Sequence, residues 1–584
     1  MSRRYHRGWL CSNSISGVRA GLTVGIHRAF ISIAVPAAIG VRYRRGENMK
    51  QSERPWSKKG GPAGPFDAIV IGSGMGGMTA AAMLAQVGKR VLVLEQHYVP
   101  GGFTHAFKRG PYEWDVGVHA IGEVGPKSMM GRLLSTLTDG RLEWASLGGV
   151  YDEFYYPGLR IDFPDNAEGF RANLVAAFPD EEQAIDAYLD EVRRVGRAMK
   201  GYLKSRAIPP TWWGNAVGNR MSKGAQQAFE VTAQDVLDRI TPNRKLQKVL
   251  TGQWGYHGSP PSRAAFAVQA LVSRHFMHGA FYPVGGSKRI AIELLRKVAD
   301  AGGWTRICAD VDEILIDRKR AVGVRLTTGE EIRATTVVSG AGIMSTAQRL
   351  LPESARGPWV DEVGALSPAP AHVCLYLGFR GDIRDAGAGS ANKWFYDVWD
   401  TDAGVWDINA TDPVPECPVI YTSFPSLKNP HHDAGEAQHH TGEAVTFVPY
   451  EVFEPWRTQP ARRRDAEYAA FKSRITDQLL SQLFRRMPKL KPMLDFAELG
   501  TPISTDHFCR PMKGSIYGIE PTIERYACDH LRAHSPIRGL YFAGCEVGAV
   551  GVMGAMAGGM LAAAAVQPRA VGSLLADASK RPHF

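Results

Sequence analysis

The stretch IGSGMGGMTAAAMLAQVGKRVLVLEQ, residues 71–96, decides the fold class of this chain. A short apolar run, FDAIVI at 66–71, leads into it and predicts a buried strand. Small and apolar residues after the glycine-rich turn predict a helix that ends near Gly88. RVLVL at 90–94 predicts a second strand, and Glu95 follows it directly. Strand, glycine turn, helix, strand and acid in this order are typical of a dinucleotide-binding α/β unit.

Three glycines at G-x-G-x-x-G spacing, Gly72, Gly74 and Gly77, each have a separate reason to lack a side chain. The first allows a tight turn, the second lets the backbone approach a pyrophosphate, and the third lets the helix pack closely on the strand. The phosphate meets free N–H groups at the helix start, and an acid such as Glu95 can accept hydrogen bonds from a ribose. We therefore predict cofactor contacts at these glycines, at Gly76 and at Glu95.

The residues after Glu95 favour a flavin dinucleotide over a nicotinamide one. Pro100-Gly101-Gly102 interrupts the chain where a nicotinamide-binding fold would pass into its next helix. Paired glycines let the backbone run close against a flat, extended cofactor, although a plain surface loop is the alternative. Gly101 and Gly102 are accordingly predicted to contact the cofactor.

A second strand-to-turn-to-helix pattern lies near the C-terminal end of the sequence, in residues 538–566. LYFA predicts a strand, Gly544 breaks it, Glu546 follows, and a helix of small residues begins near Met553. The helix dipole would face the phosphates of a cofactor. We predict cofactor contacts at these three residues, so that one cofactor is held by both ends of the chain.

Several longer runs resemble the flavin-dependent phytoene desaturase, carotenoid isomerase and retinol saturase group, and the similarity is strongest to the retinol saturases. The resemblance covers residues 64–568 and rests on the runs YPVGGSKRIAIELL, TTVVSGAG, LYFAGCEVG, GQWGYHGSPPSRAAFAVQALVSRHFMHGAFYPVGG, IYTSFPSLKNP, FVPYEVFEPW and MKGSIYGIEPTIERY. It implies an α/β fold in which a Rossmann-like FAD-binding domain, glutathione-reductase-like and of the GR2 type, carries an inserted α+β substrate-binding domain. Val311, at the start of VDEILID, is a further predicted FAD contact.

The predicted domains are discontinuous. Residues 64–155, 285–350 and 500–568 form the FAD-binding domain, and residues 156–284, largely helical by pattern, join 351–499 in the substrate-binding domain. Ligands of such sheets bind outside the carboxyl ends of the strands, so the flavin ring should lie where the two domains meet. Residues 1–63 are expected to be a basic extension and 569–584 a tail.

The net charge of +11 does not indicate nucleic-acid binding, because much of it is confined to one end. Residues 1–48 hold eight arginines and one acid, which gives 8 − 1 = +7. This stretch is either a transit-like peptide or precedes the true start at Met49, and we favour the second interpretation. Seven cysteines without a C-x-x-C pair predict a reduced, cytoplasmic protein without a structural metal.

Any contact with a membrane is expected to be peripheral, because no segment has roughly 18 consecutive apolar residues. Basic residues between Arg193 and Lys223 surround Trp212 and Trp213. Such a composition suits an anionic membrane surface from which a lipophilic substrate could be taken. A solvated helix face is the alternative.

A flavin can move a hydride to or from carbon, so the protein must orient the substrate and exclude water. Reduction of an alkene also needs a proton donor, and we predict Glu520, Tyr517 and His119 as candidates. The alternatives are that Glu520 is an ion-pair partner, that Tyr517 lines an apolar wall, and that His119 is structural. Aromatic residues are expected to line the substrate tunnel: Trp254, Tyr256, Phe276, Phe281, Tyr282, Tyr450, Phe453 and Trp456.

The function predicted from these features is FAD-dependent oxidoreduction at carbon–carbon double bonds of a retinoid, carotenoid or other polyene or isoprenoid lipid. Saturation is preferred to desaturation or isomerisation on the strength of the resemblance. A flavin amine oxidase is one alternative, and a non-enzymatic prenyl-binding protein of the Rab GDP-dissociation-inhibitor type is another. The sequence shows no second dinucleotide fingerprint, so it does not identify the electron donor or acceptor.

Overall fold

The computed structural model describes residues 54–209, 211–400, 405–408 and 413–580. All the described residues belong to one compact unit, which spans residues 48–584. The predictions for residues 1–48 and for the start at Met49 therefore lie outside the described residues.

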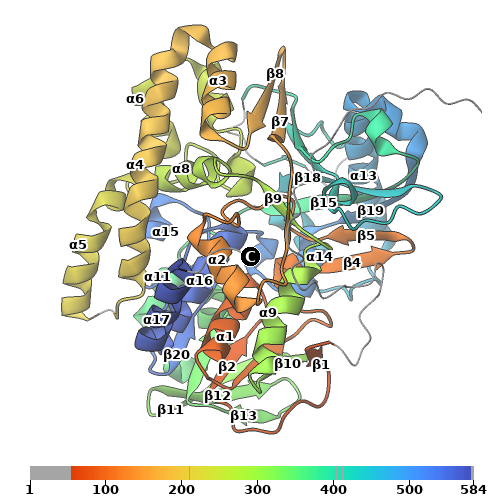
Figure 1. Cartoon of the computed structure of the whole chain (residues 1–584). Coiled ribbons are helices and arrows are strands. Elements are labelled where there is room, and N and C mark those ends of the chain that lie inside the picture. The colour runs from red at the N-terminus through yellow and green to blue at the C-terminus, as the bar shows by residue number, and fades with distance from the viewer. Residues whose placement is uncertain (1–53, 210, 401–404, 409–412, 581–584) are drawn as a thin grey trace, which may run out of the picture. The chain divides into compact units, whose positions relative to one another are not determined.

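A six-stranded sheet, parallel throughout, forms the centre of one half of the described chain (Figure 1). Its strands come from both ends and the middle of the chain, and one of them, at residues 56–57, lies in the segment 1–63 that was predicted to be an extension. Their order across the sheet is β1 (Trp56–Ser57), β10 (Trp304–Ile307), β3 (Val91–Glu95), β2 (Ala68–Ile71), β14 (Thr336–Ser339) and β20 (Leu540–Phe542). The strands β2 and β3 are wholly buried because both faces of the sheet are covered. The predicted α/β class is confirmed.

Helices cover one face of this sheet and a small sheet covers the other. The helices are α1 (Met75–Gln86), α9 (Lys288–Asp300) and α16 (Gly551–Val566), whose apolar residues share one core. The opposite face packs against the antiparallel strands β11 (Val311–Asp317), β12 (Arg320–Leu326) and β13 (Glu331–Arg333).

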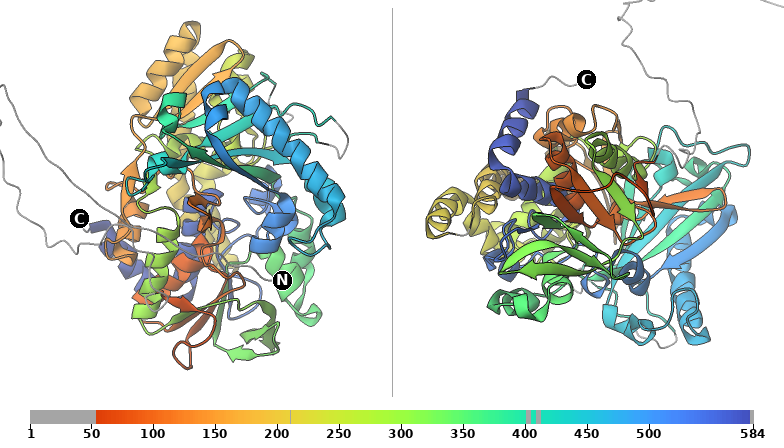
Figure 2. Two further views of the ribbon diagram at one scale, coloured as in Figure 1. Left: turned by 90° about the vertical axis from the view of Figure 1, so that its right-hand side faces the viewer. Right: turned by 90° about the horizontal axis from the view of Figure 1, so that it is seen from below.

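A seven-stranded sheet forms the second half, and its neighbours are antiparallel except for the parallel pair β16 and β7. The order is β19 (Leu494–Gly500), β15 (Ala371–Arg380), β18 (His439–Val448), β17 (Val419–Ser423), β16 (Asn392–Tyr396), β7 (Val150–Tyr156) and β8 (Leu159–Pro164). Helix α13 (Ala466–Arg486) covers one face (Figure 2), and its apolar stripe of Phe471, Ile475, Leu479 and Leu483 is buried there. The other face is free to line a site, since successive side chains on a strand alternate between faces.

The helical insertion predicted for residues 156–284 follows strand β8. It comprises α3 (Ala167–Ala177), α4 (Glu182–Arg206), α5 (Trp212–Phe229), α6 (Ala233–Ile240), α7 (Arg244–Leu250) and α8 (Phe266–His275). Helix α5 packs against the C-terminal part of α4 (Figure 1). Among the described helices, none combines the length and the apolar character needed to cross a membrane.

Shorter elements connect these layers. They are β4 (Ala106–Arg109), β5 (Tyr112–Asp115), α2 (Met129–Leu137), β6 (Trp144–Ser146), β9 (Phe281–Pro283), α10 (Ile343–Ser345), α11 (Pro358–Gly364), α12 (Pro425–Lys428), α14 (Pro502–Cys509), α15 (Ile523–Ala527) and α17 (Pro568–Lys580). Strand β7 spans the predicted boundary at residue 155 and belongs to the second sheet. The division into domains stays a prediction. In the structure, the chain enters the seven-stranded sheet at residue 150.

Candidate functional site

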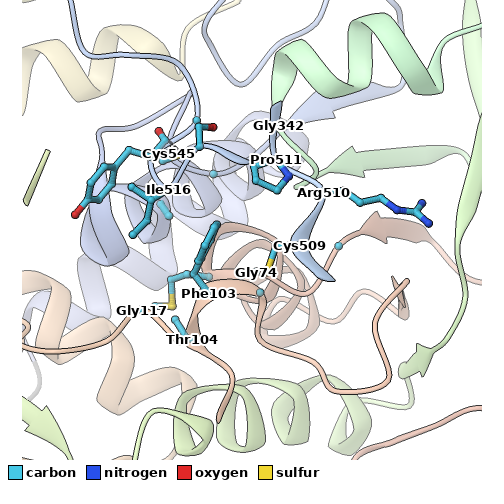
Figure 3. A pocket seen from close by; sticks show the side chains of 18 of the residues that line it. Gly74, Phe103, Thr104, Gly117, Gly342, Cys509, Arg510, Pro511, Ile516 and Cys545 are labelled. Atoms are coloured by element: carbon cyan, nitrogen blue, oxygen red, sulfur yellow. Dashed lines mark hydrogen bonds between the residues drawn. The ribbon is translucent and has the colours of Figure 1, made fainter. Parts of the chain in front are cut away.

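A cavity of about 320 Å³ lies where the two large sheets meet. The glycine turns after β2 and β20 line one end of it, and side chains from the seven-stranded sheet line the other. Figure 3 shows Phe103, from the N-terminal segment, facing Ile516 and Cys545 from the C-terminal segment across this space. A volume of this size is in the range of small-molecule sites.

The two glycine turns touch each other although they come from opposite ends of the chain. A Cβ atom at Gly76 would lie 2.5 Å from the backbone N and Cα of Gly544. On the partner helix, a Cβ at Gly559 would lie 2.3 Å from the carbonyl oxygen of Gly76. Helices α1 and α16 can therefore approach only because these positions lack side chains, and the two ends of the chain meet at this cavity.

Both helix starts at this site leave their first N–H groups without a side-chain cap. Gly74 precedes α1 and Val550 precedes α16, and neither helix has a capping side chain among the described residues. Gly74, Gly551 and Val552 line the cavity. Uncapped N–H groups and the helix dipole together favour an anion, so the geometry suits the pyrophosphate of a dinucleotide.

Glu95 ends strand β3 and is tied into the first glycine turn. Its Oε2 atom accepts hydrogen bonds from the backbone N of Ser73 (2.9 Å) and from Ser73 Oγ (2.6 Å), and its Oε1 atom accepts one from the N–H of His97 (2.7 Å). The same Ser73 Oγ accepts from the N–H of Gly101 at 3.0 Å. Ser73 thus joins the first turn to the paired-glycine segment, a role that sequence reasoning missed although the residue lies inside the quoted fingerprint.

The predicted cofactor residues divide into those that line the cavity and those that support it. The lining ones are Gly72, Gly74, Gly76, Glu95, Gly102, Val311, Gly544 and Glu546. Gly77, Gly101 and Met553 are absent from the lining among the described residues. A Cβ at Gly77 would lie 2.1 Å from the carbonyl oxygen of Gly72, so this glycine allows α1 to pack on the turn. Met553 is 9% exposed and packs in the helical core beneath the sheet.

Glu546 faces the cavity but is already engaged with the protein. Its Oε2 atom accepts hydrogen bonds from the N–H groups of Ile343 and of Met344 (3.3 Å). Burial raises the pKa of Glu546, and the guanidinium of Arg525 opposes that shift. Arg525 is itself buried and donates to the carbonyl oxygens of Ile519 and Cys545. These contacts fix the turn that follows β20.

The first two candidates for proton transfer, Glu520 and Tyr517, take different places. Glu520 accepts from Ser259 Oγ at 2.8 Å and pairs with Arg263 at 3.0 Å, and it does not belong to the described lining. Tyr517 lines the cavity, and its hydroxyl donates to the carbonyl oxygen of Gly255 at 3.0 Å. The geometry thus favours the ion-pair interpretation of Glu520 and the wall interpretation of Tyr517.

His119 lines the cavity directly above a buried acid on strand β18. Its Nδ1 atom lies 2.9 Å from Oε2 of Glu443, and neither Nδ1 nor the two carboxyl oxygens have any other hydrogen-bond partner among the described residues. Burial raises the pKa of Glu443 to about 8, against the charge of Lys428. Burial lowers the pKa of His119 to about 3, and Lys428 acts in the same direction. At neutral pH the carboxyl therefore keeps its proton and the imidazole is neutral.

Lys428, a buried residue near the cavity, connects the segment of His119 to strands β16 and β17. Its ammonium donates to the carbonyl oxygen of His119 at 2.7 Å, to Ser423 Oγ at 2.6 Å and to Oδ1 of Asn392. All three of its donors are thereby used. Burial lowers the pKa of Lys428 to about 7, opposed by Glu443 and other buried acids. Neither Lys428 nor Glu443 was predicted; the only signal was that each is the single Lys, Arg, Asp or Glu in its run, IYTSFPSLKNP and HHTGEAVTFV.

An aromatic wall completes the cavity on the side of the second sheet. It contains Trp254, Tyr256, Trp394, Tyr421, Phe447 and Tyr517. On each strand the neighbouring side chain, such as Phe395 or Ile420, points to the α13 core instead. Of the aromatic residues predicted for the tunnel, only Trp254 and Tyr256 are in the lining among the described residues. Tyr450, Phe453 and Trp456 pack in the α13 core, so that part of the prediction was wrong.

Comparison with protein families agrees with this geometry. Residues 75–567 match the family model described as flavin containing amine oxidoreductase. The chain belongs to this family. The match confirms the prediction that this protein is a flavin oxidoreductase.

Curated relatives cover most of the chain. An all-trans-retinol 13,14-reductase from Danio rerio is 31% identical over 523 residues, which are 85% of this chain and 85% of the relative. A chloroplastic prolycopene isomerase from Arabidopsis thaliana is 26% identical over 80% of this chain and 76% of its own length. A solved oxidoreductase from Methanosarcina mazei has a TM-score of 0.58 at 15% identity and covers 84% of this chain and 98% of that structure. This last likeness concerns the fold.

Proposed function

We propose that this flavin oxidoreductase uses FAD to reduce a carbon–carbon double bond of a polyene or isoprenoid lipid. The observation that carries the proposal is a single cavity with an anion-binding glycine end and an aromatic end. Names of relatives that act on retinol and prolycopene support a conjugated substrate. Flat aromatic side chains can hold such a chain at low entropic cost.

FAD is favoured over a mononucleotide because the cavity offers two separate phosphate-facing helix starts and a ribose-facing acid. Gly74 and Gly551 mark the uncapped starts of α1 and α16, and Glu95 would hold the ribose. When bound, the flavin would supply a hydride to one carbon of the double bond. The dinucleotide would be bound by turns from both ends of the chain.

The second carbon of the double bond needs a proton, and we assign its delivery to His119 and Glu443. In the tautomer with hydrogen on Nε2, the imidazole gives that proton to carbon while Nδ1 takes the proton of the Glu443 carboxyl, 2.9 Å away. The raised pKa of Glu443 keeps the carboxyl protonated at neutral pH. A buried acid without a hydrogen-bond partner costs stability, and such a cost is typical of functional sites.

Lys428 is a positioning residue in this scheme. Its hydrogen bond to the carbonyl oxygen of His119 fixes the backbone that carries the imidazole. Asp115 fixes the same loop from the other side, because it accepts hydrogen bonds from Ser287 and Tyr282. The aromatic wall keeps water from the reacting carbons. The two electrons come from an external two-electron donor that reduces the flavin.

The proposal is tested with purified protein that carries flavin. The flavin is reduced anaerobically, and the protein is then incubated with all-trans-retinol, a carotenoid and an unsaturated fatty acid. A product two mass units heavier than its substrate is expected for one polyene. An unchanged mass with altered chromatographic retention would mean isomerisation instead. Absence of any product from the whole panel would contradict the proposal.

Amine oxidation is the second candidate, since the family model itself carries that description. The rings of Trp394 and Tyr421 lie 4.6 Å apart, edge to face, and both line the cavity. Aromatic faces of this kind can also bind an ammonium group. Oxygen-dependent release of hydrogen peroxide with alkyl amines, and none of the heavier product with polyenes, would favour this candidate.

A further inference from the structure

Helix α5 presents its largest apolar side chains to solvent. Trp212 is 71% exposed, Trp213 is 65% exposed, and Val217, one turn further along, is 49% exposed. The two indole rings lie 4.0 Å apart and make one continuous apolar surface. Each exposed tryptophan leaves on the order of 100 Å² or more in water, and large side chains of this kind are normally placed inside.

The inner face of α5 explains why the tryptophans point outward. Its buried residues are mostly small: Gly214, Gly218, Ala225 and Ala228, followed by Phe229. A Cβ at Gly201 of α4 would lie 2.1 Å from the carbonyl oxygen of Met221, so the two helix backbones are in close contact. No room is left for an indole between them. Close packing of the two helices therefore leaves the tryptophans on the outer face of α5.

The charge around these tryptophans is of one sign. Between residues 192 and 229 the chain has eight basic residues and no acid. Arg193 and Arg194 pair with acids of the preceding turn, and Arg206 is buried against Tyr202. The other five are exposed and have no ion-pair partner among the described residues: Arg197, Lys200, Lys204, Arg220 and Lys223.

The apolar and basic side chains of α5 share one side of the helix. At 100° per residue, Trp212, Trp213, Val217, Arg220 and Lys223 fall within an arc of roughly 140°. Lys200 and Lys204 lie on the adjacent helix α4, at the left edge of Figure 1. The surface thus combines a tryptophan pair with a belt of unpaired cations along the two helices.

We propose that this face of the α4–α5 hairpin docks on an anionic lipid surface. Indole rings prefer the boundary between headgroups and acyl chains, and basic residues are attracted to anionic lipids. A protein partner is disfavoured by composition, because three of the five unpaired cations are lysines and lysine is depleted in protein interfaces. The surface needs no flavin and no particular substrate, so this proposal stands apart from the proposed reaction.

The test is flotation of the full-length, flavin-loaded protein with phosphatidylcholine vesicles that contain or lack phosphatidylserine. The wild-type protein should float with the anionic vesicles, and raised salt should release it because the charges are screened. Lys200→Glu with Lys204→Glu should weaken the partitioning by at least about tenfold. Trp212→Ala with Trp213→Ala should weaken it by at least about tenfold as well.

A matched control is Arg318→Glu with Lys319→Glu, which makes the same change in net charge at an exposed turn between β11 and β12. This variant should float like the wild type, which matters because residues 1–48 are also basic. Equal binding of all variants, or equal losses in the control and the hairpin variants, would overturn the proposal. So would light scattering that shows a dimer for the wild type and a monomer for the tryptophan variant, since the surface would then bind a second copy.

Discussion

The two ends of the cavity differ in the atoms that line them: backbone at one end and side chains at the other. The glycine end is made of backbone: uncapped helix starts and two turns in contact where a single Cβ at Gly76 would meet Gly544 at 2.5 Å. The aromatic end is made of side chains, three from β16, β17 and β18 of the second sheet and three from the segments at 254–256 and 517. Backbone geometry tolerates almost no substitution at such contacts, whereas one face of a sheet can change its side chains without changing its strands.

In the proposed function, this difference separates the residues that would hold the cofactor from those that would act on the substrate. Glu95 and the glycines belong to short local patterns, and they can accept any dinucleotide of suitable shape. His119, Glu443 and Lys428 come from three separate segments and meet only in the folded chain. We expect substitutions at the glycine end to affect folding or flavin content, and substitutions at the other end to affect turnover.

The largest effect is expected for Gly76→Ala. The new methyl group would meet the backbone of Gly544, which has no flexible side chain to move aside. Such overpacking costs about 1–3 kcal/mol or more, and the displaced turn should lose its flavin. Thermal unfolding and the flavin absorbance of the purified variant measure both effects. Gly572→Ala, on α17 with nothing within 4 Å of the new atom, is the matched control; a wild-type melting temperature for Gly76→Ala would break the comparison.

Glu443→Gln should lower turnover by about 100-fold while the flavin content stays unchanged, because an amide cannot pass a proton to His119. In the wild type, turnover should fall as the pH rises through about 8, where the carboxyl loses its proton. This step in the pH profile should disappear in the variant. Glu498→Gln, an acid of the same sheet that pairs with Arg109, serves as control. An unchanged pH profile would remove Glu443 from the proposed reaction.

Gly74→Ala should have a smaller and more selective effect. No protein atom lies within 4 Å of the new methyl group, so the melting temperature of the flavin-free protein should not change. The methyl group would instead enter the cavity beside the start of α1. We expect flavin affinity to fall by about tenfold, roughly 1.4 kcal/mol, in a titration of the flavin-free protein with FAD. Unaltered affinity would mean that the phosphate does not approach this turn.

The smallest effect is expected for Glu520→Gln. Glu520 bonds Ser259 and Arg263, and the arginine side chain is half exposed, so an amide can replace the carboxylate at a cost of about 1 kcal/mol or less. Turnover should stay within about threefold of the wild type. Assays of Glu443→Gln and Glu520→Gln under the same conditions compare the two acids directly. A loss at Glu520 as large as that at Glu443 would restore Glu520 as the proton donor.

Other residues show which features a local sequence pattern does not predict. His119 was predicted as a candidate proton donor, and it does line the cavity. Met553 was predicted from its place at a helix start, but the rotation of α16 turns it into the core. Strand alternation likewise divides the aromatic residues between the cavity and the α13 core. Helix rotation and strand facing depend on packing partners, which a single sequence pattern does not contain.

The sequence by itself determined the dinucleotide fold, the flavin family and most of the glycine end. Each of these predictions rests on short runs whose own residues lie within a few positions of one another. Only the tertiary structure decided that Glu443 lies beneath His119, that Lys428 supports it, and that Glu520 is held in an ion pair away from the cavity. The physical reason is that a buried carboxyl takes its charge state from its whole surroundings. Those surroundings are assembled from distant segments only when the chain folds.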